Sequence, residues 1–559
     1  MMSVRVRKEI VKTDFLIVGG GIGGLQAAIT ASGLGVDTIV VEKADTRRSG
    51  CGANGNDHFA CYIPECHGDD FEKVVREINM TMDGGPWQDQ VMLRTWLKRS
   101  FEIVQLWESI GIDMRPTGKW NFEGHSLPGQ QRYHLKFDGK NQKKALTDTA
   151  RKNGARIMNH TLIHEILVNQ DGRVIGAIGV DVSQDEPEVV LFETKAMLLA
   201  PGMASRLYPG ITPAYMFNTP CCPAVTGSGH AMGFRAGAKL VNIDVPQGHA
   251  GPKYFARGGK GTWIGVSSNL DGSCVTPYNS KPSRELGDVT ADVWPSVYRD
   301  KMKDGTGPAF MNCTELSDED MDYMLHTAFV SEGIDSLTDY FDQNGIDLKE
   351  SMIEFGSYPE MMNQKGIEID EHAATNVPGL YAAGNTVGNS SGNLTGAAVF
   401  GMVAGESVAE YIKGVEFEPV EGHPWVADRI RLYTDLMGRE GANWKEAAST
   451  LQNIMKEYAG LEIRSEGIMT TGLKYIRQLR EYARKELAAE NSHELMRTLE
   501  VLDMIDLGEA IILTGLNRKE SRGQFQRADY TYTNLTLNNK FQTICKKDGK
   551  IVREYRNRR

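Results

Sequence analysis

Runs of apolar residues punctuated by glycine open the chain. An apolar run over residues 15–18 enters Gly19-Gly-Gly-Ile-Gly-Gly, an alanine-rich stretch follows, and a second apolar run over 36–41 ends in Glu42. Short apolar runs predict β-strands, and the stretch between them has the length of a helix. The pattern therefore predicts a β-strand–helix–β-strand unit over residues 14–43.

The spacing of apolar positions changes along the rest of the chain. Residues 70–112 carry apolar side chains every three or four positions, which predicts amphipathic helices. Short apolar runs between 155 and 201, with a turn at Asp171-Gly172, predict strands. Helical spacing returns after about residue 420 and predicts a helical C-terminal region.

A second glycine-rich segment lies late in the chain. Residues 375–385 read Thr-Asn-Val-Pro-Gly-Leu-Tyr-Ala-Ala-Gly-Asn, and small residues fill 391–401. An apolar strand followed by a helix of small residues brings a second helix N-terminus to a cofactor. The chain is therefore predicted to have an α/β fold, with a dinucleotide-binding domain built from two separate parts of the sequence.

The glycine spacing indicates how a dinucleotide binds. Gly19 permits a tight turn, Gly21 lets a pyrophosphate approach the backbone, and Gly24 lets the helix pack close to the strand. Glu42, at the end of the second strand, is placed to accept hydrogen bonds from a ribose. A second cofactor-binding segment at 375–385 favours FAD over NAD, because FAD also has a ribityl chain and an isoalloxazine ring that the protein must hold.

Composition and charge narrow the class of protein. A chain of 559 residues is expected to form more than one compact unit, and 41% hydrophobic and 24% charged residues are typical of a soluble globular protein. A net charge of −11 argues against nucleic acid as a partner. No apolar run reaches the length of a membrane span and no secretion signal precedes the first strand, which predicts a cytoplasmic location.

Eight cysteines are spread along the chain without a Cys-x-x-Cys pair. This spacing argues against an iron–sulfur cluster, a zinc ribbon or a disulfide framework in the chain itself, and it fits a reducing compartment. Cys61, Cys66 and His67 leave a metal site open, but incidental thiols are the favoured interpretation and no metal is predicted. Cys221 and Cys222 leave open a thiol that faces the substrate.

Three further segments carry a family resemblance: Arg48-Ser-Gly-Cys-Gly-Ala-Asn-Gly, Leu198-Leu-Ala-Pro-Gly and Arg518-Lys-Glu-Ser-Arg. With the two glycine-rich segments, they resemble the flavoprotein subunits of the succinate dehydrogenase and fumarate reductase superfamily. The resemblance implies a two-part GR2-type FAD-binding Rossmann-like domain, an inserted α+β capping domain and a C-terminal helical domain with a basic tail. The implied boundaries are 1–245 and 352–419 for the FAD-binding domain, 246–351 for the capping domain and 420–559 for the C-terminal domain.

Positions where the chain departs from the superfamily pattern indicate how its flavin is attached and which substrates it does not use. Gly50 stands where members with covalent flavin carry the histidine that bonds it, so the FAD is expected to be non-covalent. Residues 385–393 lack the arginine that binds a substrate carboxylate in fumarate and succinate enzymes, and the two histidines of that site are also missing. Glycine and serine cannot replace a bidentate carboxylate clamp. Succinate–fumarate chemistry is therefore not expected.

The chain is most similar to the alpha subunits of adenylylsulfate reductase, which share Glu42-Lys43, Arg48-Ser-Gly and Arg527-Ala-Asp-Tyr. The resemblance implies an oxidoreductase of anaerobic respiration that forms a heterodimer with a ferredoxin-like subunit bearing [4Fe–4S] clusters. Its substrate would be a small anion, with adenylylsulfate first. Two alternatives stay open: a fumarate-reductase-like enoate reductase, and a flavin subunit that only relays electrons within a larger complex.

Motif and resemblance together assign the FAD site. The predicted cofactor-binding residues are Gly19, Gly21, Gly24, Glu42, Lys43, Ser49, Gly50, Asn54, Gly55, Gly384 and Asn385.

Catalysis is predicted to reside in the capping domain. Lys253, Arg257 and Lys260 lie among glycines, as is typical of an anion-binding loop, and a solvated basic loop is the alternative. His249 is a candidate proton donor or orienting group. Arg299 resembles the cap arginine that protonates enoates in fumarate reductases.

The C-terminus is strongly basic. The last 20 residues hold eight Lys or Arg against two acids. A solvated tail and a clasp on an acidic partner are both consistent with this composition.

Overall fold

The structure of the chain is a computed structural model. It describes residues 4–53, 55–79, 85–126, 129–210, 219, 221–245, 247–253, 262–275, 280–287, 297–360, 365–391, 393–461 and 463–559, with the backbone alone at 247–249 and 358–360. No helix in these ranges is both long enough and apolar enough to cross a bilayer.

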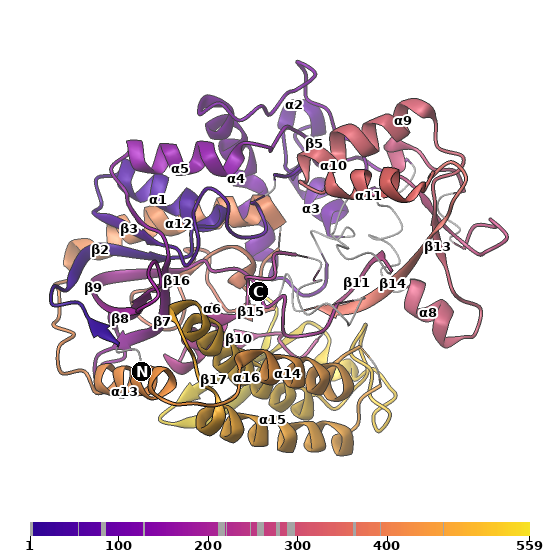
Figure 1. The fold of residues 1–559 in the computed structure, drawn as a ribbon. Helices are drawn as coiled ribbons and strands as arrows, with labels where there is room; N and C mark the ends of the chain where they lie inside the picture. Colours follow the sequence, from indigo (N-terminus) through magenta and orange to yellow (C-terminus); the bar gives the residue numbers. More distant parts are fainter. Residues whose placement is uncertain are drawn as a thin grey trace.

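A large sheet forms the centre of the FAD-binding part (Figure 1). Its strand order is β6-β3-β2-β9-β8-β7, and β1 and β16 also pair with β9. The strands are β1 (Arg5–Val6), β2 (Val11–Val18), β3 (Thr38–Val41), β6 (Arg156–Met158), β7 (Thr161–Val168), β8 (Val174–Asp181), β9 (Glu188–Leu199) and β16 (Leu380–Ala382). Strands β6, β3, β2, β9 and β16 are parallel, whereas β8 runs antiparallel to both of its neighbours, β9 and β7. The predicted α/β class is confirmed.

Two helices from distant parts of the chain cover the parallel half of this sheet. Helix α1 (Ile22–Gly33) follows β2 and packs on α12 (Asn393–Tyr411), beside α5 (Gln142–Lys152) (Figure 1). A side chain at Gly401 of α12 would place its Cβ 2.3 Å from the carbonyl oxygen of Gly23. The small residues predicted to begin this helix therefore allow two backbones to lie almost in contact.

The other predicted elements of this part also form. The unit over 14–43 is β2–α1–β3, and the helical segment over 70–112 contains α3 (Phe71–Ile78) and α4 (Gln90–Ser109). The strands predicted between 155 and 201 are β6 to β9, and Gly172 takes the left-handed conformation in the turn between β7 and β8.

The capping part is a second, smaller layer at the right of Figure 1. It contains an antiparallel sheet of order β11-β14-β13-β12 and its own hydrophobic cluster around Trp263, Phe329 and Phe355. The strands are β11 (Gln247–Pro252), β12 (Val266–Ser268), β13 (Phe310–Asn312) and β14 (Ile353–Glu360), and the helices are α8 (Val297–Lys303), α9 (Asp318–Tyr323), η2 (Met324–Ala328), α10 (Phe329–Ser331) and α11 (Ser336–Asn344). The sheet continues to Glu360, beyond the expected end at 351, because β14 pairs with both β11 and β13.

Four helices and a hairpin complete the C-terminal part. The helices are α13 (Pro424–Gly438), α14 (Trp444–Ala459), α15 (Glu466–Glu486) and α16 (Ser492–Asn517). The hairpin of β17 (Lys540–Lys547) and β18 (Lys550–Asn557) extends a sheet of order β15-β10-β17-β18, in which β10 is Leu240–Val241 and β15 is Gly366–Ile367. The helical domain is therefore confirmed, with a hairpin at its end.

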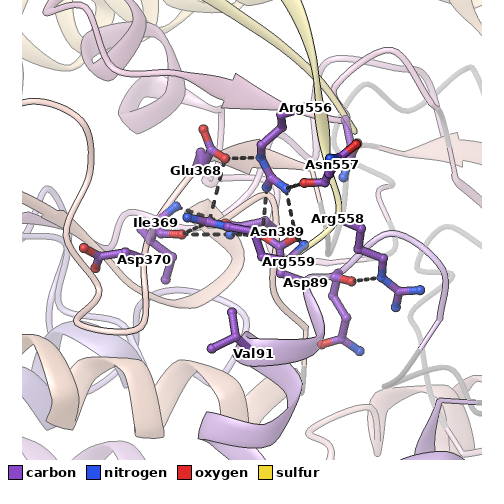
Figure 2. A network of polar contacts seen from close by, with 12 residues as sticks. Asp89, Val91, Glu368, Ile369, Asp370, Asn389, Arg556, Asn557, Arg558 and Arg559 are labelled. Atoms are coloured by element: carbon purple, nitrogen blue, oxygen red, sulfur yellow. Dashed lines mark hydrogen bonds and ion pairs between the residues drawn. The ribbon is translucent and has the colours of Figure 1, made fainter. Parts of the chain in front are cut away.

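The sequence left two interpretations of the basic tail open, a solvated tail and a clasp on an acidic partner, and three arginines of the C-terminus fit neither. Arg556 Nη2 lies 2.7 Å from Asp89 Oδ2, Arg559 Nη2 lies 3.1 Å from the same oxygen, and Arg558 Nε donates to the carbonyl of Gln88 (Figure 2). Burial works to raise the pKa of Asp89, but the hydrogen bonds and charge of Arg556 outweigh it and lower the pKa. These arginines are bound within the chain, so they do not form a free clasp for a partner.

Candidate active site

A cavity of about 770 Å³ lies where the parallel strands end. Val18, Val41, Ala200 and Ala383, which end or follow β2, β3, β9 and β16, all line it. The carboxyl edge of a parallel sheet is the usual place for a dinucleotide, because the loops and helix N-termini converge there. The cavity therefore lies where the sequence predicts the cofactor.

The glycine loop has the conformation that the motif requires. Gly19 has φ +97°, and a Cβ there would lie 2.6 Å from the carbonyl oxygen of Ala200. A Cβ at Gly24 would lie 2.0 Å from the carbonyl oxygen of Gly19, so this glycine allows helix and strand to touch. Gly21 lies at the N-cap of α1, faces the cavity, and leaves ordinary contact distance for a Cβ, 3.6 Å from Ala200 O.

Glu42 is held in one orientation at the cavity wall. Its Oε2 accepts a hydrogen bond of 2.7 Å from the Gly20 N–H and its Oε1 one of 2.9 Å from the Ala44 N–H. The adjacent Lys43 also lines the cavity, but its ammonium pairs with Glu500 of α16 at 2.6 Å and donates to Ala224 O. Lys43 therefore joins the C-terminal helices to the cofactor site.

Other predicted cofactor residues converge on the same cavity. The lining also includes Ser49, Gly50, Gly55, Gly384 and Asn385. The Ser49 hydroxyl is buried without a hydrogen-bond partner among the described residues, as expected of a group that awaits a ligand. Asn54 lies outside the described residues. The glycine turn, the fixed Glu42 carboxylate and the unpaired Ser49 hydroxyl all fit FAD.

Helix α5 supplies two positioning residues that sequence reasoning missed. Gln142 Nε2 donates to Asn56 Oδ1 at 2.6 Å and to Gly52 O at 3.1 Å, which fixes the loop after Ser49. Lys143 donates to the carbonyl of Gly20, and burial lowers its pKa to about 8. No sequence motif marks these residues, because their partners lie far away along the chain.

Two of the predicted catalytic cations, Lys253 and Arg299, form ion pairs within the capping part. Lys253 Nζ is 2.5 Å from Glu354 Oε1, and Arg299 Nη2 is 3.3 Å from Asp300 Oδ1. Neither residue is among the described lining of the cavity. His249 lies opposite Tyr358 in the β11–β14 pair, its side chain undescribed, and Arg257 lies outside the described residues.

The structure bears on the two cysteine-containing sites that the sequence left open. Cys221 and Cys222 line the cavity, as the sequence left open, and burial raises the pKa of the Cys222 thiol. A raised pKa keeps this thiol protonated and weakly nucleophilic. His67 belongs to the group Cys61, Cys66 and His67 that left a metal site open. One of its ring nitrogens accepts a hydrogen bond from the Ile63 N–H and the other lies 3.1 Å from the Arg132 carbonyl, so its role is structural.

His58, His134 and Glu332 are among the residues of the wall that were not predicted. His58 and His134 enter from the short strands β4 (His58–Ala60) and β5 (His134–Lys136), and Glu332 enters from the capping part. Gly55 brings the two parts together: it has φ +102°, and a Cβ there would lie 2.2 Å from Ser331 O. The signal in the sequence was the pair Asp57-His58, directly after the loop expected beside the isoalloxazine.

Comparison with known proteins agrees with this geometry. Residues 14–400 match the family model of the FAD binding domain, and residues 448–556 match the fumarate reductase flavoprotein C-terminal model. The chain belongs to this family of FAD-binding proteins. It is an FAD-dependent oxidoreductase of the fumarate reductase and succinate dehydrogenase family, as the sequence predicted.

Three relatives illustrate the range of the family. The chain is 25% identical to one of the subunits of the fumarate reductase (CoM/CoB) of Methanothermobacter marburgensis, over 94% of this chain and 96% of that protein. The adenylylsulfate reductase structure from Archaeoglobus fulgidus superposes with a TM-score of 0.82 at 22% identity, over 100% of this chain and 96% of that one. An E. coli quinol fumarate reductase structure gives 0.80 at 20% identity, over 100% and 97%. These two structures share the fold.

Proposed function

We propose that this chain is the flavin subunit of an oxidoreductase that exchanges electrons between a small anionic substrate and an iron–sulfur partner. The cavity carries the proposal, because one wall is formed by the FAD-binding loops and the other by Glu332 and Ile334 of the capping part. A substrate between these walls would lie against the flavin ring and be shielded from water by the cap.

The iron–sulfur partner is inferred from what the chain itself lacks. None of its eight cysteines has the spacing of a cluster-binding motif. Electrons that reach FAD from a substrate then need an acceptor outside this chain. The fumarate reductase relatives support the same division of labour, since they are named as subunits.

Two substrate classes follow from the likenesses. Adenylylsulfate is favoured by the sequence resemblance to adenylylsulfate reductase and by the likeness in fold. An unsaturated carboxylate is favoured by the fumarate reductase relatives. Residues 385–391 contain no arginine, and Asn389 in this segment is engaged by Asp89, so a dicarboxylate clamp of the fumarate type is not proposed.

Anaerobic titration of the FAD-loaded chain tests the proposal. Adenylylsulfate, sulfite with AMP, fumarate and aryl-acrylates are added to oxidised and to dithionite-reduced protein while the flavin spectrum is followed. An enzyme subunit shows a spectral change that depends on one of these substrates. A chain that responds to none of them but passes electrons to a partner is a relay, and this result would refute the substrate-binding role.

A further inference from the structure

His58 is a histidine of the cavity wall with one ring nitrogen already fixed. It lines the cavity at the start of β4, and its Nδ1 lies 2.5 Å from Asp57 Oδ1. An ionised carboxylate accepts hydrogen bonds only, so Nδ1 carries the proton in this contact. Nε2 is then the ring nitrogen that gains or loses a proton, as in other carboxylate–histidine pairs.

Asp57 is itself fixed from behind. Its Oδ2 accepts a hydrogen bond of 2.7 Å from Lys136, which pairs with His58 across the β4–β5 ladder. Asp57 and Lys136 are both buried. Burial raises the pKa of Asp57, but the charges of Lys136 and His58 outweigh it and keep the pKa well below its usual value. Asp57 therefore stays ionised and holds the imidazole in one orientation.

Glu332 approaches His58 from the capping part. Its carboxylate is fixed by Thr262, whose N–H donates at 2.8 Å and whose hydroxyl donates at 3.0 Å. One carboxylate oxygen each of Asp57 and Glu332 and one ring nitrogen of His58 lie within 4.8 Å of one another. His58 is thus at the junction of the two walls between which a substrate would lie.

Burial and the neighbouring charges have opposing effects on the pKa of His58. Burial, which is the largest cause, together with Lys136 and His134 lowers the pKa of His58 by more than Asp57 raises it, so the pKa lies below its usual value. The rings of His125 and His134 lie 4.5 Å and 5.5 Å from the His58 ring, centroid to centroid. Lys136 already neutralises Asp57, so the cluster is better suited to moving a proton than to holding a metal cation.

We propose that His58 exchanges a proton with the substrate through Nε2 and that Asp57 is its positioning residue. This proposal rests on the proposed function and deepens it. When bound and reduced, FAD would supply hydride, an electron pair and one proton, to one carbon of the double bond of an unsaturated carboxylate. The neighbouring carbon accepts the second proton from His58: the Nε2–H bond breaks, a C–H bond forms, and the neutral imidazole regains a proton from solvent.

The role of His58 also distinguishes the two substrate classes. Cleavage of adenylylsulfate to sulfite and AMP consumes two electrons and needs no proton on carbon. A histidine held by a carboxylate against the cavity therefore favours a substrate whose reduction adds hydrogen across a double bond. Unsaturated carboxylates accordingly come ahead of adenylylsulfate as substrates to test.

Three variants of the full-length, FAD-loaded chain test this role: His58→Gln, Asp57→Asn and, as a control, His326→Gln on the exposed surface of the capping part. Each is reduced with dithionite and mixed with an aryl-acrylate while flavin reoxidation is followed from about pH 5 to about pH 9. We expect His58→Gln to slow reoxidation by about 10²- to 10⁴-fold, the usual contribution of a general acid, with the flavin spectrum and FAD content unchanged. His326→Gln retains the wild-type rate and pH profile.

A second readout needs no substrate. Histidine C2–H exchange, followed by mass spectrometry across pH, reports the protonation midpoint of each histidine. Because Asp57 raises the pKa of His58, Asp57→Asn moves the His58 midpoint to lower pH and moves the pH profile of reoxidation in the same direction. The control His326→Gln leaves the His58 midpoint in place. An unchanged His58 midpoint in Asp57→Asn overturns the positioning role.

The outcomes separate the two proposals. Wild-type reduced protein that no substrate reoxidises refutes the proposed function, and the role of His58 falls with it. Wild-type protein that is reoxidised no faster than His58→Gln at every pH overturns the role of His58 and leaves the proposed function standing. Should His58→Gln lose its FAD, His58→Asn replaces it, because an asparagine amide can still donate to Asp57.

Discussion

Gly21 is a position where the ligand, and not the fold, requires glycine. Its φ is −69°, which any residue adopts, and a Cβ would meet only ordinary contact at 3.6 Å. Gly21→Val is therefore expected to fold normally but to purify with little FAD, since its side chain would occupy the space of the pyrophosphate. Flavin absorbance per protein and the melting curve of the apoprotein measure both effects.

Gly19→Val is the matched control for that substitution. Gly19 has φ +97°, and its Cβ would clash with the backbone of Ala200. This variant should lose stability even without cofactor, by a few kcal/mol. Full FAD content in Gly21→Val would show that the pyrophosphate does not bind at this loop.

Gly50 offers no side chain for a covalent bond to flavin. It lines the cavity and has φ +76°, a conformation that favours glycine. We expect acid precipitation to release all the FAD into the supernatant, measured by its absorbance. Yellow colour that stays with the pelleted polypeptide would contradict a non-covalent cofactor.

Arg257 remains the sequence's candidate for holding the substrate anion. Arg257→Ala is expected to weaken substrate binding by about 1–3 kcal/mol, the range for a charge-assisted hydrogen bond, with FAD content unchanged. Lys253→Ala is a useful comparison, because Lys253 pairs with Glu354 within the capping part. Equal loss of substrate affinity in both variants would mean that Arg257 does not contact the substrate and that both substitutions act by destabilising the capping part. Steady-state kinetics with the identified substrate gives both values.

At the scale of elements, Asp89 connects strand β18 to residues 385–391, which follow the second glycine-rich segment. Its Oδ2 accepts hydrogen bonds from Arg556 and from Asn389 Nδ2 at 2.9 Å, and its N–H donates to Asn389 O at 2.9 Å (Figure 2). Asp89→Ala leaves Arg556 partly buried without this counterion. It should reduce the free energy of unfolding by about 3–5 kcal/mol and speed FAD release, because residues 385–391 lose their anchor.

The exposed pair of Arg94 with Glu72 provides the comparison for Asp89. Both side chains are more than two-fifths exposed, so Arg94→Ala should change stability by less than about 1 kcal/mol. Chemical unfolding and the rate of flavin fluorescence recovery on dilution measure the two effects. Unchanged FAD release in Asp89→Ala would show that strand β18 does not support the cofactor segment.

Glu500 on helix α16 makes the stability of the chain depend on pH. Burial works to raise the pKa of Glu500, but the charges of Lys43, Arg206 and Arg497 lower it from 4.5 to about 2. The ionised form is therefore stabilising in full above about pH 4.5, and this stabilisation is lost as pH falls toward about 2. Glu500→Gln should cost about 3–5 kcal/mol at neutral pH and remove this part of the acid dependence. Urea unfolding of both proteins across this window tests the expectation.

For the whole molecule, the proposed partner is open to direct test. Native pull-down of the untagged chain followed by iron analysis should recover a small ferredoxin-like protein with iron and acid-labile sulfide. Arg556 at the end of β18, and Arg558 and Arg559 directly after it, are bound within the chain, so any basic contact with the partner must use other residues. A flavin-only homo-oligomer with full turnover on NAD(P)H would contradict the partner.

Local patterns in the sequence were enough for the cofactor and the class of fold. The close contact at Gly24 and the hydrogen bond of Glu42 are each set by neighbours within one β-strand–helix–β-strand unit, so their spacing predicts their geometry. The resemblance of the remaining motifs then implied the inserted cap and the C-terminal helices. Composition misled at the C-terminus, because a count of charges cannot reveal a buried carboxylate that binds them.

What only the tertiary structure decided are the pairings between distant segments. The register of β4 with β5 brings Lys136 to Asp57 and thereby orients His58, while the cap brings Glu332 to the same wall. Arg556 and Asp89 are 467 residues apart in the sequence. Such contacts depend on how sheets and helices pack, and no local spacing encodes them. The sequence by itself therefore determined the flavin and its binding loops, whereas packing determined which other side chains line the cavity.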